Sequence, residues 1–186
     1  MKDLFGAEWD DGADGRGKGK GMLRVIGASN CALTERAAAD FYATPPEAVE
    51  MLLGLEDFSE SILEPCCGMG HVGKVLEAHG HHVDARDLIF RGYGRGGMDF
   101  LRCDDRGLDA DVVTNPPYAL AREFVEKSLE VVADGHKVAM FLKLTFLEGK
   151  ARRLLFESAP PRRIWVSSSR LCCAKNGEDF VQSCIC

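Results

Sequence analysis

The sequence predicts an α/β domain with a mostly parallel sheet and helices on both faces. Short apolar segments with strand character alternate along the chain with segments of helical period, which is typical of strand–helix–strand units. The strand expected at 61–63 runs into a glycine-rich turn, EPCCGMG at 64–70, that opens a helix. The next expected strand ends at a carboxylate, Asp87. Ligands of such sheets bind beyond the carboxyl ends of the strands, so both places are candidate site positions.

Size and composition allow one globular domain. The chain has 186 residues, 46% of them hydrophobic, and a formal net charge of −6. A fully disordered chain is excluded, and any basic surface for nucleic acid must be local. No apolar run approaches the roughly 18 residues of a membrane helix, and the N-terminus lacks signal-peptide character, which predicts a cytoplasmic protein without a membrane partner. The eight cysteines are expected to be buried thiols rather than disulfides or metal ligands.

Two regions of the chain differ in amino-acid composition. Residues 1–35 include the charged, glycine-rich stretch DDGADGRGKGKG at 10–21, which cannot bury a core and predicts a flexible tail. The folded domain is expected to span residues 36–186.

The expected elements follow from apolar spacing, with Gly and Pro as boundaries. Thr44 as N-cap, Pro45 at the first helical position and Glu47 form a capping box, which predicts where the first helix begins. In order, the expected elements are a helix over 45–53, a strand over 61–63, a helix over 71–79, strands over 82–87, 98–101 and 110–114, a helix after Tyr118, a strand over 137–144, a helix over 148–158, and strands over 164–167 and 180–185.

The turn after the strand at 61–63 could hold a nucleoside cofactor. Its glycines let the backbone approach a ligand closely, and Asp87 can accept both hydroxyls of a ribose. Gly68, Gly70 and Gly73 satisfy G-x-G-x-x-G, which keeps a nicotinamide-dependent dehydrogenase as an alternative. Glu64 precedes these glycines, and a carboxylate there would repel a pyrophosphate. It suits a ligand with a cationic amino group, such as the methionine end of S-adenosylmethionine.

A second candidate site follows the strand at 110–114, where the chain reads Asn115-Pro116-Pro117-Tyr118. A planar amino group is a poor nucleophile because its lone pair is delocalised. Two acceptors on its hydrogens, the Asn115 side-chain oxygen and the Pro116 carbonyl, can draw it toward a tetrahedral geometry, and the prolines fix the backbone that aims them. Tyr118 offers a ring on which a planar base can stack.

In combination, these motifs resemble those of the class I S-adenosylmethionine-dependent methyltransferases. The matching motifs are FYATP (41–45), EPCCGMG (64–70), Asp87, MDF (98–100) and NPPY (115–118). They are most similar to the adenine-N6 DNA methyltransferases, and within these to small enzymes of phages and prophages. The resemblance covers residues 35 to 175 and implies a Rossmann-like fold whose seven-stranded sheet has one antiparallel strand near its C-terminal edge.

The resemblance also implies roles for individual residues. Asp87 would hold the ribose hydroxyls of S-adenosylmethionine, and Asp99 would accept from its adenine amino group beside Phe100. The implied catalytic residues, which would hold the target amino group and base, are Asn115, Pro116, Pro117 and Tyr118. The implied cofactor-binding residues are Phe41, Tyr42, Thr44, Pro45, Glu64, Cys66, Gly68, Gly70, Asp87, Asp99, Phe100 and Asn115.

The expected acceptor is adenine in nucleic acid, with DNA favoured by the resemblance. Although the chain is acidic, residues 148–175 carry seven basic and two acidic side chains. The residues expected to contact phosphates are Lys143, Arg152, Arg153 and Arg170.

Three alternatives remain open at this point. The same fold could methylate an amino or amide nitrogen in RNA or in a protein glutamine. The short segment after 180 is also compatible with a protein that binds cofactor or nucleic acid without turnover. The dehydrogenase is the third alternative.

Overall fold

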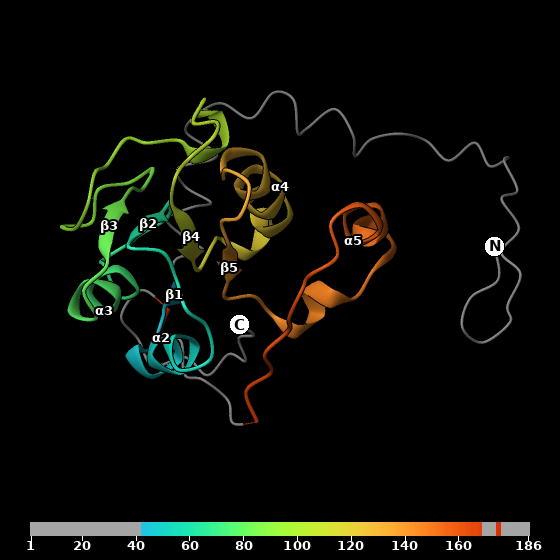
Figure 1. The fold of residues 1–186 in the computed structure, drawn as a ribbon, viewed down its shortest axis with the longest axis horizontal. Coiled ribbons are helices and arrows are strands. Elements are labelled where there is room, and N and C mark those ends of the chain that lie inside the picture. Colours follow the sequence, from blue (N-terminus) through green and yellow to red (C-terminus); the bar gives the residue numbers. More distant parts are fainter. Residues whose placement is uncertain (1–41, 169–173, 176–186) are drawn as a thin grey trace, which may run out of the picture.

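Four parallel strands form the central sheet, in the spatial order β3-β2-β4-β5 (Figure 1). The computed structural model describes residues 42–168 and 174–175. The strands are β2 (Ser61–Glu64), β3 (His82–Ala85), β4 (Asp111–Thr114) and β5 (Val138–Met140). The chain passes from β2 outward to β3 and then back across β2 to β4, so the winding direction reverses between β2 and β4. Open α/β sheets bind their ligands at such a reversal.

Helices cover both faces of this sheet. The α-helices are α2 (Pro46–Leu53), α3 (Gly73–Ala78), α4 (Ala121–Val131) and α5 (Arg153–Ser158). Helices α2 and α3 pack on one face against Ile62 and Val113, whereas α4 packs on the other face against Leu63 and Val112. Neighbouring residues of a strand point to opposite faces, so β2 and β4 each supply both cores. The expected α/β architecture is confirmed.

A strand expected over 98–101 is absent, and that prediction was wrong. Residues Phe100–Arg102 form a 3-10 helix, η2, instead. The cause is local: the Asp99 carboxylate accepts a hydrogen bond from the Leu101 amide at 3.2 Å and turns the chain. The turn also buries the Phe100 ring in the core beneath α4.

The elements after β4 are shorter than expected. Three further 3-10 helices occupy connections, namely η3 (Tyr118–Leu120), η4 (Leu144–Leu147) and η5 (Lys150–Arg152). The strand expected over 137–144 is therefore confined to Val138–Met140, and the helix expected over 148–158 is divided between η5 and α5.

The strand expected over 164–167 does not form. Ile164 and Val166 are 45% and 57% exposed, and this stretch has no ladder partner among the described residues. Glu56 holds it to the domain through Arg163 and through the Trp165 indole nitrogen, which donates at 3.2 Å. β-branched residues favour a strand only where a neighbouring strand is there to pair with them.

A second, two-stranded sheet is antiparallel. Strand β1 (Tyr42–Ala43) pairs with β6 (Ala174–Lys175), with Tyr42 opposite Lys175. The strand expected over 180–185 and the tail expected over 1–35 lie outside the described residues, so the seven-stranded sheet stays a prediction. Within the described part of the chain, no helix has the length and apolarity to cross a membrane.

Candidate active site

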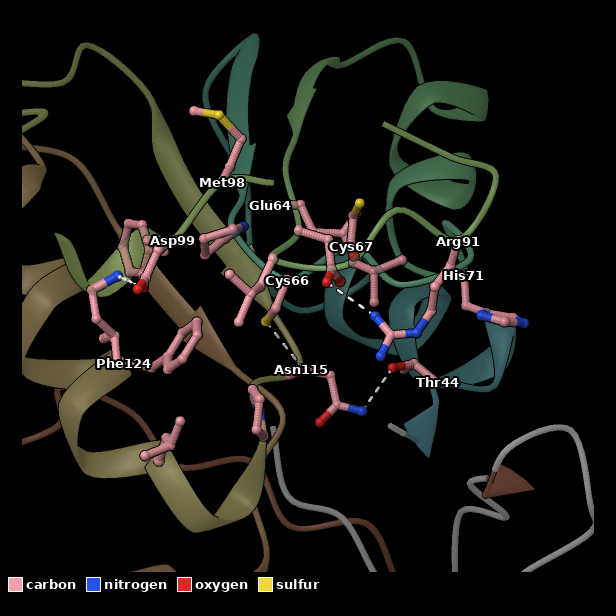
Figure 2. A pocket seen from close by; sticks show the side chains of 18 of the residues that line it. Thr44, Glu64, Cys66, Cys67, His71, Arg91, Met98, Asp99, Asn115 and Phe124 are labelled. Carbon is pink, nitrogen blue, oxygen red and sulfur yellow. Dashed lines mark hydrogen bonds and ion pairs between the residues drawn. The ribbon is translucent and has the colours of Figure 1, made fainter. Parts of the chain in front are cut away.

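A pocket opens at the carboxyl edge of the sheet, next to the ends of β2, β3 and β4 (Figure 2). It lies at the reversal between β2 and β4, where an α/β sheet is expected to bind its ligand. Residues from all five sequence motifs meet in its lining. They are Thr44, Glu64, Cys66, Asp87, Asp99, Phe100, Asn115 and Pro117.

The turn after β2 needs its glycines. Gly68 and Gly70 have φ angles of 56° and 81°, which side-chain-bearing residues rarely adopt. A Cβ on Gly70 would lie 2.5 Å from Cγ of the Tyr93 ring, so the ring itself forbids a side chain there. Neither glycine lines the pocket; instead they shape the turn, and the Gly68 amide donates to Asp87 Oδ2 at 2.8 Å.

Glu64 ends β2 as a buried carboxyl group, only 1% exposed. Its Oε2 accepts no hydrogen bond from any described residue. Burial raises the pKa of Glu64 well above its usual range and outweighs the Gly73 amide, which lowers it, and the nearby carboxylates of Asp87 and Glu77 raise it further. A negative charge here is therefore costly in the protein alone, and a cation placed beside it would offset that cost.

Asp87 follows β3 and is 7% exposed. Oδ1 accepts from the Ile89 amide at 2.8 Å and from Arg91 Nη1 at 3.0 Å, while Oδ2 accepts from Gly68. The carboxylate thus joins the turn after β2 to the loop after β3.

One end of the pocket is aromatic. The rings of Phe100 and Phe124 lie 5.5 Å apart between centroids and are tilted by 37°. Asp99 lies on the same side of the pocket as Phe124 (Figure 2), and its Oδ2 is 3.3 Å from Arg102 Nε. A flat apolar ring carrying an amino group would match this combination of aromatic rings and carboxylate.

Asn115 also lines the pocket, and it directly follows the fully buried strand β4. Its Nδ2 donates to Thr44 Oγ1 at 2.9 Å, and the Thr44 side chain is buried (Figure 2). Thr44 was expected to cap helix α2, and that prediction was wrong: Pro45 is the N-cap, and no side chain caps the helix. The Thr44 hydroxyl is engaged with Asn115 instead.

The three residues after Asn115 differ in their surroundings. Pro116 is fully buried, Pro117 lines the pocket, and Tyr118 begins η3. The Lys143 ammonium lies 4.6 Å from the centroid of the Tyr118 ring, a cation–π distance. A ring and a positive charge therefore meet three residues after Asn115 along the chain.

The thiols of the turn remain protonated at neutral pH. Cys66 shares a hydrogen bond with Thr114 Oγ1 at 2.8 Å, and burial raises its pKa well above the usual value. Burial also raises the pKa of Cys67 to about 12. Neither is a thiolate nucleophile. Cys67 is buried as the sequence predicts, whereas Cys66 is partly exposed and lines the pocket. Across the described residues, no three His, Cys, Asp or Glu side chains gather in a way that could hold a metal ion.

The predicted phosphate-contacting residues differ in their surroundings. Arg152 donates to the carbonyls of Thr145, at 2.8 Å, and Glu148, and its guanidinium lies 4.9 Å from the Phe146 ring, so it fixes its own loop. Arg153 is exposed and paired with Glu157 at 2.7 Å. Arg170 and Phe41 lie outside the described residues, as does the side chain of Tyr42.

Sequence reasoning missed Arg91, His71 and the Thr44–Asn115 hydrogen bond. Arg91 and His71 line the pocket. Arg91 forms an ion pair with Asp87 four residues earlier, but residues 87–91 are a loop, so helical spacing could not have indicated it. No local pattern could have joined Thr44 to Asn115, since 71 positions separate them.

Comparison with solved structures gives this arrangement a family context. A TehB-like S-adenosylmethionine-dependent methyltransferase from Corynebacterium glutamicum has a TM-score of 0.50 at 16% identity, over 76% of this chain and 84% of that one. A modification subunit of a putative type I restriction enzyme from Vibrio vulnificus has a TM-score of 0.52 at 15% identity, over 83% of this chain and 46% of that one. This is the fold of the S-adenosylmethionine-dependent methyltransferases.

The methyltransferase fold expected from the motifs is therefore confirmed, while the finer resemblance to adenine-N6 enzymes of phages stays a prediction. TrmN from Thermus thermophilus is a weaker match, with a TM-score of 0.42 at 20% identity over 80% of this chain and 51% of that one. The chain spans about half the length of TrmN and of the restriction-enzyme subunit. No protein-family profile and no curated protein matches the sequence.

Proposed function

We propose that this protein transfers the methyl group of S-adenosylmethionine to the N6 amino group of adenine in DNA. The observation that carries the proposal is the position of Asn115. Its side chain lines the same pocket as Glu64 and Asp87, at the end of a buried strand. A place for a cofactor and an acceptor for an amino group thus share one space.

The lining residues fit S-adenosylmethionine. The unpartnered Oε2 of buried Glu64 suits the cationic amino group of the methionine end. Asp87 would take the ribose hydroxyls, and Asp99 with Phe100 would take the adenine ring and its amino group. When bound, the cofactor supplies a methyl group on a positively charged sulfur, which is a good leaving group.

The chain's own contribution is to prepare the amino nitrogen. The Asn115 side-chain oxygen and the Pro116 carbonyl accept the two amino hydrogens and draw the nitrogen toward a tetrahedral geometry. Tyr118 stacks on the target base and fixes its plane. The nitrogen so prepared would form its bond to the methyl carbon as the carbon–sulfur bond breaks, which leaves the sulfur as a neutral thioether, and one amino proton would pass to water. The transfer is a direct displacement without a covalent enzyme intermediate. Most of the rate enhancement comes from holding the nitrogen and the methyl carbon in position.

Lys143 favours nucleic acid as the acceptor. Its ammonium lies beside the Tyr118 ring, so a base stacked there would have a positive charge close to its own phosphate. Arg153 is exposed on α5 and would add a phosphate contact farther out. A base in duplex DNA must be flipped out at a cost of a few kcal/mol, so single-stranded or mismatched DNA is the easier substrate.

A labelled-methyl assay tests the acceptor. The protein is incubated with methyl-labelled S-adenosylmethionine and with single-stranded DNA, duplex DNA, RNA or protein, and each product is digested to its monomers. We expect label in N6-methyldeoxyadenosine, with more from single-stranded than from duplex DNA. Label confined to RNA or to glutamine would retain the methyltransferase and reject the DNA assignment.

Two further measurements test the site. Asn115→Ala is expected to keep cofactor binding and to lose most of the turnover, and near-normal turnover would reject the role of Asn115.

Calorimetry should show binding of S-adenosylmethionine and none of NAD, because the buried Glu64 carboxyl disfavours a pyrophosphate. Tight NAD binding would favour the dehydrogenase instead.

A further inference from the structure

A guanidinium lies inside the candidate cofactor pocket, although the proposed cofactor carries two positive charges. Arg91 lines the pocket with its side chain 18% exposed. In Figure 2 it lies on the side of Thr44 and Asn115, away from Asp99 and the aromatic end. The sulfonium and the ammonium of S-adenosylmethionine would both repel it. The carboxylate of the methionine end is the one negatively charged group of that cofactor, and so the group that Arg91 attracts most strongly.

Asp87 cannot serve a ribose while Arg91 remains bound to it. A carboxylate offers about four acceptor positions. Three are filled here, by the Gly68 amide at 2.8 Å, the Ile89 amide at 2.8 Å and Arg91 Nη1 at 3.0 Å. Two ribose hydroxyls need two positions, so one present donor must leave.

Arg91 is the donor that can leave. The Gly68 and Ile89 amides belong to the backbone of loops that follow β2 and β3, and the β2–β3 ladder fixes those loops. The Arg91 donor stands at the end of a long side chain with several rotatable bonds, which can turn without any change in the backbone.

We propose that, on cofactor binding, Arg91 exchanges Asp87 for the carboxylate of the methionine end. The inference rests on the proposed function and deepens it by naming what selects the cofactor. Glu64 and Arg91 then divide the methionine end between them, a buried carboxyl for its ammonium and a guanidinium for its carboxylate. Guanidinium and carboxylate match in shape, because two parallel N–H groups can meet the two oxygens.

The exchange makes Arg91 a specificity-determining residue. A nucleoside without a carboxylate leaves Arg91 on Asp87, where it competes with the ribose hydroxyls. A nucleoside with a carboxylate draws Arg91 away and frees Asp87. The site therefore selects the intact amino-acid cofactor against its breakdown products, such as 5′-methylthioadenosine.

Calorimetry with three ligands tests the exchange. S-adenosylmethionine and its decarboxylated form differ only in the carboxylate, and 5′-methylthioadenosine lacks the amino-acid end. The wild-type protein should prefer S-adenosylmethionine over its decarboxylated form by about tenfold to a hundredfold. In Arg91→Gln that ratio should fall to near one. Arg91→Gln should also bind 5′-methylthioadenosine at least as tightly as the wild type, because Asp87 is released.

Arg102→Gln is the matched control, since Arg102 is the other arginine that the structure places in the pocket lining, paired with Asp99 at the aromatic end. It should leave the ratio of the two affinities unchanged. A wild-type ratio near one, or a ratio that survives Arg91→Gln, overturns the inference and leaves the proposed function intact. Loss of all three ligands in Arg91→Gln shows a structural role and also overturns it. A wild-type protein that binds no S-adenosylmethionine overturns the proposed function itself.

Discussion

Two buried carboxyl groups, Glu64 and Asp111, stand at opposite edges of the sheet and have opposite pKa shifts. Both are nearly inaccessible, at 1% and 3% exposure. Burial pushes the pKa of each upward. At Asp111 the amides of Lys137 and Ser59, both at 2.7 Å, outweigh burial and lower the pKa. At Glu64 nothing outweighs it, and the pKa is raised well above its usual range.

The difference shows how the two edges are used. Asp111 begins β4 at the amino edge, where each of its oxygens accepts hydrogen bonds from the neighbouring loops, so it is complete without a ligand. Glu64 ends β2 at the carboxyl edge and leaves Oε2 unsatisfied among the described residues. A buried group that is costly in the free protein marks the place where a ligand contributes to stability.

The largest expected effect is the loss of stability when Asp111 is substituted. Asp111→Ala should lower the free energy of unfolding by about 3 kcal/mol, because it leaves two part-buried amides without an acceptor. Urea denaturation measures the loss. Asp111→Asn keeps one acceptor and should lose less. Cofactor affinity of the folded protein should not change in either variant, and a tenfold change would mean that the two edges are not independent.

Glu64→Gln should affect binding and stability in opposite directions. Affinity for S-adenosylmethionine should fall by about tenfold or more, measured by calorimetry. The pKa of Glu64 is raised above its usual value of 4.5, so its contribution to stability is present below that pH and is lost as pH rises through the folded-state pKa. Glu64→Gln should therefore be the more stable protein at pH 8. A less stable variant there would contradict the raised pKa.

Thr44→Val should have a smaller effect, confined to turnover. The valine cannot accept from Asn115 Nδ2, so the amide loses one of its anchors, and methyl transfer should slow by about fivefold to tenfold. Thr44→Ser retains the hydroxyl and should restore the rate. Equal losses in both variants would show that packing, rather than the hydrogen bond, is what matters at this position.

The smallest effect concerns His136 at the amino edge. Hydrogen bonds to Asp109, at 2.9 Å, and Asp111, at 3.0 Å, raise its pKa above the usual 6.5. Its contribution to stability is therefore present below pH 6.5 and is lost as pH rises through the folded-state pKa. Thermal denaturation of His136→Gln between pH 6 and pH 9 (about the range in which such a group titrates) should show a flatter dependence than the wild type. Parallel curves would reject this coupling.

Local sequence signals were sufficient for the carboxyl edge of the sheet. The glycine turn at 64–70, the carboxylate at 87 and the asparagine at 115 each follow an apolar strand, and a parallel sheet brings such positions to one edge. The alternation of strands and helices, read together with these strand-end motifs, therefore predicted that the residues would meet.

Other features depended on contacts that no local pattern records. Residues 44–47 match the capping-box pattern, but the Thr44 hydroxyl accepts a hydrogen bond from Asn115 and does not cap the helix. The segment MDFL at 98–101 has the apolar pattern of a strand, but the Asp99 side chain accepts from the Leu101 amide and caps a 3-10 turn there. Ile164 and Val166 have strand propensity, yet propensity without a ladder partner leaves them exposed.

The hydrogen bonds between the turn after β2 and the loop after β3 have a thermodynamic consequence. Two hydrogen bonds link these segments beyond the β2–β3 ladder: Cys67 N donates to the Arg86 carbonyl at 2.9 Å, and Gly68 N donates to the Asp87 side chain at 2.8 Å. The floor of the pocket is thus ordered before any ligand arrives, and association need not freeze it. Calorimetric entropy should accordingly reflect released water and a single reoriented arginine rather than the folding of a loop.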